Sequence, residues 1–318
     1  MNGARHLRLI PAIVGPTCSG KSDLGIRLAL EFNGEIINLD SVQVYREINI
    51  ATAKVPEHER RGIPHHLIDI ADPVDNFTAG DYARLASDAI RDIEARDRTA
   101  ILVGGTGFYL RALIRPLFSG PQTSQQLRAR LKDLHERSGA EHLHRMLERV
   151  DPQAALKLEL KDWPRTMRAL EVFFQTGRRI SESQSDLPPA PEFASRIRVL
   201  ALNPPRDELY ERINKRADLM FENGLIEEVE SLVGAGTPYD AKAFQAHGYK
   251  RVVEYLQGCR SREDALNQMK LDTRHYAKRQ LSWWRSWPDV QWLDFFGDRE
   301  EAFEEAMRFI ENEEGETR

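Results

Sequence analysis

One glycine-rich segment near the N-terminus has the spacing of a phosphate-binding loop. It matches the pattern G-x-x-x-x-G-K-[ST] and consists of Gly15, Pro16, Thr17, Cys18, Ser19, Gly20, Lys21 and Ser22. Successive backbone N–H groups in such a loop, at a helix N-terminus, bind an anion. Lys21 adds a mobile positive charge, and the Ser22 hydroxyl can ligate Mg²⁺. We therefore expect the loop to bind a polyphosphate group, with Ser22 as the metal ligand.

A carboxylate follows the next apolar run, which extends from Ile36 to Leu39 and leads directly to Asp40. A P-loop NTPase holds its Mg²⁺ with an aspartate in this position, whereas a transfer reaction could use Asp40 as a catalytic base. A helix N-cap is a third, purely structural role. All three place Asp40 at the carboxyl end of a parallel strand, where ligands bind in such sheets.

Two further positions could contact an anion. The glycines of segment 104–107 let a backbone approach a ligand, and Thr106 within it could donate a hydrogen bond, although a tight strand-to-helix turn explains the same glycines equally well. Arg212 and Arg216 lie one helical turn apart and repel each other unless an anion or a carboxylate lies between them. Glu208, one turn earlier, can satisfy Arg212, which leaves Arg216 the freer of the two to bind an anion.

The elements that must position these residues form a βαβ unit. We expect a strand at 12–14, after Pro11, then a helix at 21–32 and a strand at 36–39. Further elements are expected as a helix at 79–95 and strands at 100–103 and 196–202. A βαβ unit implies a parallel sheet. The predicted fold class is therefore α/β, a P-loop NTPase-like parallel sheet core flanked by helices.

The sequence changes character between residues 119 and 191. This stretch has helical periodicity and ends in a proline cluster at 188–191, so we expect an inserted, mostly helical domain followed by a linker. The core would then consist of residues 1–118 and of residues 192–297, the second part including C-terminal helices. Residues 298–318 are expected to form an acidic amphipathic helical tail.

Composition excludes several classes of protein. The 318 residues are 41% hydrophobic and 30% charged, which is typical of a soluble globular protein and not of a disordered or collagen-like one. Cys18 and Cys259 are the only cysteines, which excludes a disulfide framework and a cysteine-rich zinc module and indicates a reducing compartment. No apolar run approaches membrane-spanning length. We expect a cytoplasmic protein.

The net charge of −5 argues against nucleic-acid binding until its distribution is considered. Residues 298–318 hold nine acidic and three basic side chains, which leaves a net charge of +1 on the other 297 residues. Within them, Arg274 to Arg285 contains four Arg or Lys and no acidic residue. Charge alone favours a solvated helix face over a nucleic-acid contact.

Eight sequence blocks, in order, resemble the tRNA dimethylallyltransferase family, the bacterial tRNA isopentenyltransferases. They are GPTCSGKS, DSVQVY with INIATAK (40–54), PHHLID (64–69), GGTGFYLRAL (104–113), the pattern D-x-x-R-x-x-RALE (162–171), residues 212–220, GYK (248–250) and TRHYAKRQ (273–280). Three positions depart from the family pattern: Lys161 replaces an asparagine, Arg251 a glutamate and Ser282 a threonine. All three lie in regions expected to contact RNA, so the departures concern RNA details and leave the chemistry intact.

The resemblance implies transfer of a dimethylallyl group from its diphosphate to the exocyclic amine of the adenosine at tRNA position 37, next to the anticodon. The phosphate loop with Mg²⁺, Thr106 and Arg216 would stabilise the departing diphosphate, and Asp40 would accept the proton of the adenine amine. The target base must leave its stack. The implied tRNA contacts are Asp40, Ser41, Val42, Gln43, Pro164, Arg165, Thr166, Met167, Arg168, Lys250, Lys278 and Arg279. The expected partners are the tRNA anticodon stem-loop and dimethylallyl diphosphate, with no membrane, and we expect a monomer.

Two other functions remain open at this point. A small-molecule P-loop kinase would use ATP and keep Asp40 as a metal or substrate ligand, but the large helical insertion and the basic segments far from the loop argue against it. A non-catalytic RNA-binding protein with a vestigial nucleotide site is disfavoured by the intact pair Lys21 and Ser22 together with Asp40. The fate of labelled ATP and of labelled dimethylallyl diphosphate in the presence of unmodified tRNA separates all three.

Overall fold

The computed structural model describes residues 7–118, 120–183 and 187–316, and the chain divides into two compact units. The first unit combines Met1–Ile114 with Pro191–Arg318, and the second is Arg115–Ala190. Ser119, the expected start of the insertion, lies outside the described residues, as do residues 184–186 of the insertion and 317–318 of the predicted tail. No helix of the described part of the chain is long and apolar enough to cross a membrane.

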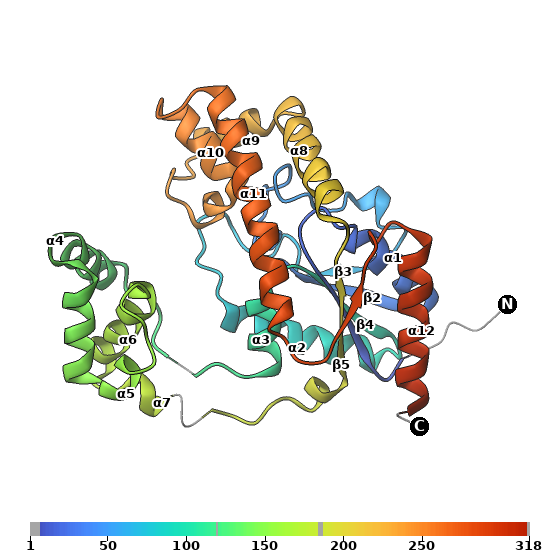
Figure 1. Cartoon of the computed structure of the whole chain (residues 1–318), viewed down its shortest axis with the longest axis horizontal. Coiled ribbons are helices and arrows are strands. Elements are labelled where there is room, and N and C mark those ends of the chain that lie inside the picture. Colours follow the sequence, from blue (N-terminus) through green and yellow to red (C-terminus); the bar gives the residue numbers. More distant parts are fainter. Residues whose placement is uncertain (1–6, 119, 184–186, 317–318) are drawn as a thin grey trace. The chain divides into compact units, whose positions relative to one another are not determined.

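A six-stranded parallel sheet forms the centre of the first unit, in the order β3-β2-β4-β1-β5-β6 (Figure 1). The strands are β1 (Ile10–Val14), β2 (Gly34–Leu39), β3 (His65–His66), β4 (Thr99–Gly104), β5 (Ile197–Leu202) and β6 (Val290–Leu293). The predicted α/β class with a parallel sheet is confirmed. The two edge strands, β3 and β6, were not predicted, because both are short and only partly buried and so lack an apolar run.

Pro11 lies inside β1, whereas the sequence placed the start of the strand after it. Strand β1 pairs with β5 from Ile10 onward, but its ladder with β4 begins only at Ala12. Proline has no N–H to give to a ladder. The strand can therefore start before Pro11, because the neighbour on one side is not yet paired there.

Alternate residues of the central strands are buried on opposite faces of the sheet. One face, with Ala12, Val14 and Leu39, packs against α2 (Ala79–Ala95), α3 (Gly107–Ile114) and Trp284; the other, with Ile13, Ile36 and Leu202, packs against α1 (Lys21–Glu31) and α12 (Glu300–Glu316). Figure 1 shows α12 alongside α1. Burial on both faces explains why these strands read as continuous apolar runs.

Four helices of the first unit pack on the segment that follows β2. They are α8 (Arg206–Glu222), α9 (Leu225–Gly234), α10 (His247–Leu256) and α11 (Arg262–Arg285), with short 3₁₀ turns at η1 (Glu57–Glu59), η2 (Glu192–Arg196) and η3 (Lys242–Gln245) elsewhere in the chain. Their apolar side chains form a cluster with Val44, Tyr45 and Ile48. The end of α11 also inserts Trp284 into the core of the sheet. The helices thus fix the segment after Asp40.

The second unit is helical and has its own apolar core. It contains α4 (Gln125–Val150), α5 (Pro152–Ala155), α6 (Trp163–Thr176) and α7 (Ile180–Ser183), with Leu131, Leu143, Leu147 and Leu170 in its centre. Glu171 of α6 is fully buried, accepts a hydrogen bond from Ser124 N at 2.8 Å and pairs with Arg168 at 2.7 Å and Arg128 at 3.2 Å. These bonds tie α6 to the start of α4.

A buried carboxylate stabilises the amino-terminal end of the sheet. Glu35 of β2 is 1% exposed and is bound by Arg98 at 3.0 Å, by His66 Nε2 at 2.6 Å and by Arg96. Burial raises the pKa of Glu35, but the hydrogen bonds from Arg96 and His66 outweigh it and lower the pKa from 4.5 to about 2. The charged form of Glu35 is therefore bound more tightly in the folded chain than in the unfolded one.

We expect Glu35→Gln to lower the free energy of unfolding by about 1–3 kcal/mol near neutral pH. Since folding lowers this pKa, the stabilisation is complete above about pH 4.5 and is lost as the pH falls towards 2. Urea unfolding near pH 7 and near pH 3 measures both. Asp92→Asn, which removes an exposed partner of the same Arg96, is the control and changes stability by less than about 0.5 kcal/mol. A parent-to-variant difference that is unchanged at the lower pH contradicts the assignment.

Candidate active site

The phosphate loop connects β1 to α1 at the carboxyl edge of the sheet. Two glycines give it its path, since Gly15 and Gly20 have φ values of 140° and 84°. Lys21 Nζ donates to Pro16 O at 2.6 Å. Burial lowers the pKa of Lys21 from 10.5 to about 8, and the nearby Asp40 opposes that effect. The loop therefore presents a buried cation together with the N-terminus of a helix, which is the arrangement that an anion stabilises.

The residues of this loop fit Mg²⁺ only jointly with a phosphate ligand. No three His, Cys, Asp or Glu side chains converge as a metal site anywhere in residues 7–118, 120–183 and 187–316. Ser22, in the first turn of α1, offers a hydroxyl oxygen, a ligand type that Mg²⁺ accepts. Mg²⁺ in proteins commonly takes its other ligands from waters and substrate phosphates. A cation held here would thus depend on the bound anion.

Asp40 lies directly after β2 and caps a turn. Its Oδ1 accepts hydrogen bonds from Val42 N at 2.8 Å and Gln43 N at 3.3 Å, and no helix begins between it and residue 56, so the N-cap role does not apply. Its Oδ2 has no hydrogen-bond partner among the described residues. The two backbone donors fix the orientation of the carboxylate. One oxygen of Asp40 is thus positioned by the protein, and the other is open to a ligand.

Thr106 bonds to the segment that carries Asp40. Its N–H donates to Leu39 O at 3.0 Å, and its Oγ1 accepts from Ser41 N at 3.1 Å. Gly104 packs so closely on β2 that a Cβ there would lie 2.2 Å from Leu39 O. The strand-to-helix turn therefore accounts for this glycine, while the Thr106 hydroxyl, beside Asp40, keeps its hydrogen for a further acceptor.

Gln280 of α11 joins the phosphate loop to this turn, and sequence analysis did not single it out. Its Oε1 accepts from Thr17 N at 2.9 Å, and its Nε2 donates to Gly105 O at 3.0 Å. The side chain is 5% exposed and shares a buried stripe of α11 with Ala277 and Trp284. A polar residue in an otherwise apolar stripe was the signal that could have identified it.

The two arginines of α8 have different partners from those expected. Arg212 pairs with Asp298 at 3.1 Å and not with Glu208, so the expected partner was wrong. Arg216 reaches the phosphate loop, where its Nη1 lies 3.5 Å from Cys18 Sγ. The structure thus brings Arg216, the loop, Asp40 and Thr106 to one edge of the sheet.

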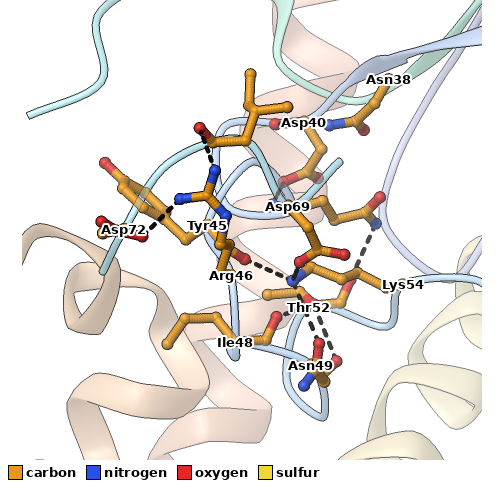
Figure 2. Close-up of polar contacts among 12 residues, drawn as sticks. Asn38, Asp40, Tyr45, Arg46, Ile48, Asn49, Thr52, Lys54, Asp69 and Asp72 are labelled. Atoms are coloured by element: carbon orange, nitrogen blue, oxygen red, sulfur yellow. Dashed lines mark hydrogen bonds and ion pairs between the residues drawn. The ribbon is translucent and has the colours of Figure 1, made fainter. Parts of the chain in front are cut away.

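The loop after Asp40 is held together by Lys54, as Figure 2 shows. Lys54 Nζ donates to Tyr45 O at 2.5 Å and pairs with Asp69 at 2.6 Å. Burial lowers the pKa of Lys54, and the bond to Asp69 opposes this. Gln43 Nε2 adds a bond to Thr52 O at 3.0 Å. These contacts explain why the INIATAK block accompanies the DSVQVY block.

A second network holds the same loop from the side of α9 and α10. The carboxylate of Glu228 accepts from Asn49 N and Ile50 N, both at 3.2 Å. The Tyr249 hydroxyl donates to Glu228 and accepts from Ala51 N at 3.3 Å. Tyr249 is fully buried, and burial together with Glu228 raises its pKa. The GYK block thus contributes a support for the loop as well as a surface lysine.

The predicted tRNA contacts of the first unit differ in accessibility. Lys250, Lys278 and Arg279 are exposed on α10 and α11, with Arg279 Nη2 3.3 Å from His247 Nε2. Arg251, by contrast, pairs with Asp272 at 2.6 Å and Glu254 at 2.7 Å. The departure from the family pattern at Arg251 therefore belongs to an ion-pair cluster of α10 and α11.

The predicted contacts of the second unit are also unequal. Pro164 and Arg165 are exposed and Met167 is partly exposed. Thr166 is 1% exposed and its hydroxyl donates to Asp162 O, so that side chain is not available to RNA. Arg168 pairs with Glu171 and also donates to Pro121 O at 2.9 Å, which gives it a structural role.

We expect Tyr249→Phe to loosen the loop without unfolding the chain. The change leaves Ala51 N without its acceptor and removes one donor to Glu228, a cost of about 1–2 kcal/mol. Hydrogen exchange of the amides of residues 49–51 should accelerate by about tenfold, because local opening becomes easier. Tyr239→Phe, at an exposed tyrosine outside the network, is the matched control. Equal exchange rates in the parent and Tyr249→Phe would show that the hydroxyl does not hold the loop.

Comparison with known proteins gives one consistent family. Residues 43–287 match the family described as IPP transferase. The chain is 47% identical to the tRNA dimethylallyltransferase of Solibacter usitatus over 300 residues, which cover 93% of this chain and 96% of that protein. It is 43% identical to the protein of the same name from Koribacter versatilis, with 95% and 98% covered.

Solved structures agree with these relatives. The full-length tRNA isopentenylpyrophosphate transferase from Bacillus halodurans is similar with a TM-score of 0.72 and 38% identity, and 97% of each chain is covered. A structure of a eukaryotic dimethylallyltransferase acting on tRNA is similar with a TM-score of 0.78 and 31% identity, covering 96% of this chain and 79% of that one.

Proposed function

Since the chain belongs to the IPP transferase family, we propose that it transfers a dimethylallyl group from dimethylallyl diphosphate to the exocyclic amine of adenosine 37 in tRNA and releases diphosphate. The observation that carries this proposal is the convergence of a diphosphate cradle with a half-free carboxylate. The cradle consists of the phosphate loop, Lys21 and Arg216, and the carboxylate is Asp40. A kinase would need a phosphoryl acceptor site, and nothing in the relatives' names indicates one.

Departure of the diphosphate is the step that the cradle would assist. The bond between the prenyl carbon and its oxygen breaks, and the electron pair leaves with the diphosphate. The growing negative charge would be stabilised by the loop N–H groups, the Lys21 ammonium and the Arg216 guanidinium. Mg²⁺, held by Ser22 and the diphosphate oxygens, would neutralise part of the same charge. In this role the phosphate loop holds a leaving group and no nucleotide is hydrolysed.

Asp40 would accept the proton that the adenine amine loses as its bond to the prenyl carbon forms. The amine is a weak nucleophile because its lone pair is delocalised into the ring. Oδ1 is held by Val42 N and Gln43 N, so the free Oδ2 can point at a bound base without reorganising. The Thr106 hydroxyl next to it could donate to the diphosphate or to the base. Together these groups support an acid–base role in preference to a metal ligand.

The tRNA would be bound through exposed side chains of both units. In the first unit these are Lys250, Lys278 and Arg279, with Ser41, Val42 and Gln43 beside Asp40; in the second they are Pro164, Arg165 and Met167. A flipped adenosine would enter next to Asp40. We further propose that the chain acts as a cytoplasmic monomer.

The direct test is to incubate the protein with unmodified tRNA, Mg²⁺ and either labelled dimethylallyl diphosphate or γ-labelled ATP. We expect label from the prenyl donor to appear in tRNA on a single adenosine, and none from ATP. Transfer of phosphate from ATP to any small molecule, with no prenyl transfer, would favour the kinase. Binding of tRNA without either transfer would favour a non-catalytic RNA-binding protein.

We expect Asp40→Asn to keep the fold and both substrates but to slow single-turnover prenyl transfer by about 10²–10⁴-fold, the usual loss for a general base. Asparagine is nearly isosteric and can still bind the amine. Asp72→Asn, which removes an exposed carboxylate paired with Arg46, is the control and retains the parent rate. A variant that recovers its full rate at high Mg²⁺ would assign Asp40 to the metal.

We expect tRNA binding to weaken steeply with salt despite the net charge of −5. Each phosphate contact contributes a slope of about −0.7 in a plot of log affinity against log salt for single strands. The double variant Lys278→Ala/Arg279→Ala should flatten the slope by about one to two contacts. The control is Arg84→Ala/Arg91→Ala, which removes exposed arginines of α2. An unchanged slope in the first double variant means that Lys278 and Arg279 do not contact phosphates.

A further inference from the structure

The back of the phosphate loop rests on a segment from the other end of the chain. Phe296, Gly297 and Asp298 lie between β6 and α12, and Gly297 N donates to Ser19 O at 2.8 Å. The family match covers residues 43–287, so this segment lies outside it. We call Phe296–Asp298 the supporting segment.

The two backbones approach each other too closely for side chains. A Cβ on Gly20 would lie 2.8 Å from Asp298 N and 2.9 Å from Gly297 N. A Cβ on Gly297 would lie 2.3 Å from Gly20 O. All of these neighbours are backbone atoms, which cannot move aside as the end of a flexible side chain can. The pairing of Gly20 with Gly297 is therefore a steric requirement of the contact.

Arg212 holds the supporting segment in place. Its Nη1 lies 3.1 Å from both carboxylate oxygens of Asp298, and its guanidinium stacks 3.6 Å over the ring of Phe296. Phe296 is 2% exposed and packs on Leu209 and Ile213 of α8. Arg212 thus connects the segment to α8, the same helix that carries Arg216 to the loop one turn later.

The contact orients a peptide of the phosphate loop. In a planar trans peptide the C=O and the following N–H point in opposite directions. Because Ser19 O is bonded to Gly297 N, the N–H of Gly20 points away from the supporting segment. That N–H has no acceptor in the described part of the chain. It is therefore free to donate to an anion, and its direction depends on Gly297.

We propose that Gly297 and the Arg212–Asp298 pair are positioning residues of the diphosphate site: they set the Ser19–Gly20 peptide so that the loop N–H groups converge on the prenyl donor. This inference rests on the proposed function, in which the loop binds diphosphate. It assigns to the C-terminal segment a part in donor binding that is separate from tRNA binding.

Gly297→Ala is the direct test, with KM for dimethylallyl diphosphate, KM for tRNA and calorimetric binding of inorganic diphosphate as readouts. We expect KM for the donor and Kd for diphosphate to rise by about tenfold, the equivalent of one displaced backbone hydrogen bond, while KM for tRNA stays within about twofold. Gly315→Ala, where a Cβ meets open space, is the matched control. Parent-like diphosphate binding in Gly297→Ala, or an equal rise of both KM values, overturns the inference.

Asp298→Asn decides the case if Gly297→Ala fails to fold. It removes the ion pair with Arg212 without adding bulk, and we expect diphosphate binding to weaken by about threefold. Glu300→Gln is its control, because Glu300 forms a comparable ion pair with Arg27 at the start of α12. Equal diphosphate binding by Asp298→Asn and Glu300→Gln overturns the inference.

Lys21→Ala separates this inference from the proposed function. If Lys21→Ala binds inorganic diphosphate as the parent does, the loop is not the diphosphate site and the proposed function fails. If Lys21→Ala loses diphosphate while Gly297→Ala and Asp298→Asn bind it normally, the proposed function stands and only the positioning role fails.

Discussion

The site is organised around an ammonium group that has been taken out of water. Lys21 is held at the turn between β1 and α1, and burial lowers its pKa to about 8. A buried cation costs free energy unless opposite charge lies near it. Asp40 supplies part of that charge from the end of the neighbouring β2–β4 pair, and a bound diphosphate would supply more. Affinity for an anion thus follows from the way the loop is built.

This arrangement needs a loop that does not collapse onto its own charge, and contacts from distant parts of the chain provide it. Gln280 fixes Thr17 N from α11, and Gly297 fixes Ser19 O from behind. Arg216 approaches from α8. Each contact uses one polar group of the loop, and the Gly20 N–H remains for a ligand. The fold therefore preorganises the donor site before the donor binds.

The acceptor side of the site is supported separately. The loop after Asp40 is closed by Lys54 on one side and by Glu228 with Tyr249 on the other (Figure 2). Because Asp40 depends on Val42 N and Gln43 N for its orientation, a loop that shifts would turn the carboxylate. The helices α9 and α10 are thus connected to the chemistry through backbone hydrogen bonds, and they contribute no reacting group themselves.

The sequence alone determined the features that depend on neighbouring residues. The phosphate loop, the parallel α/β core, α2 at 79–95 and the family all follow from local spacing and from the order of the blocks, because a loop motif or a helix repeats within a few residues. The tertiary structure alone decided which distant groups meet. Asp298 and not Glu208 neutralises Arg212, and Thr166 is buried. Gly297 and Gln280 reach the loop from more than 250 residues away. Such pairings depend on how sheet and helices pack, and side chains separated by that much sequence leave no periodic signal by which to find them.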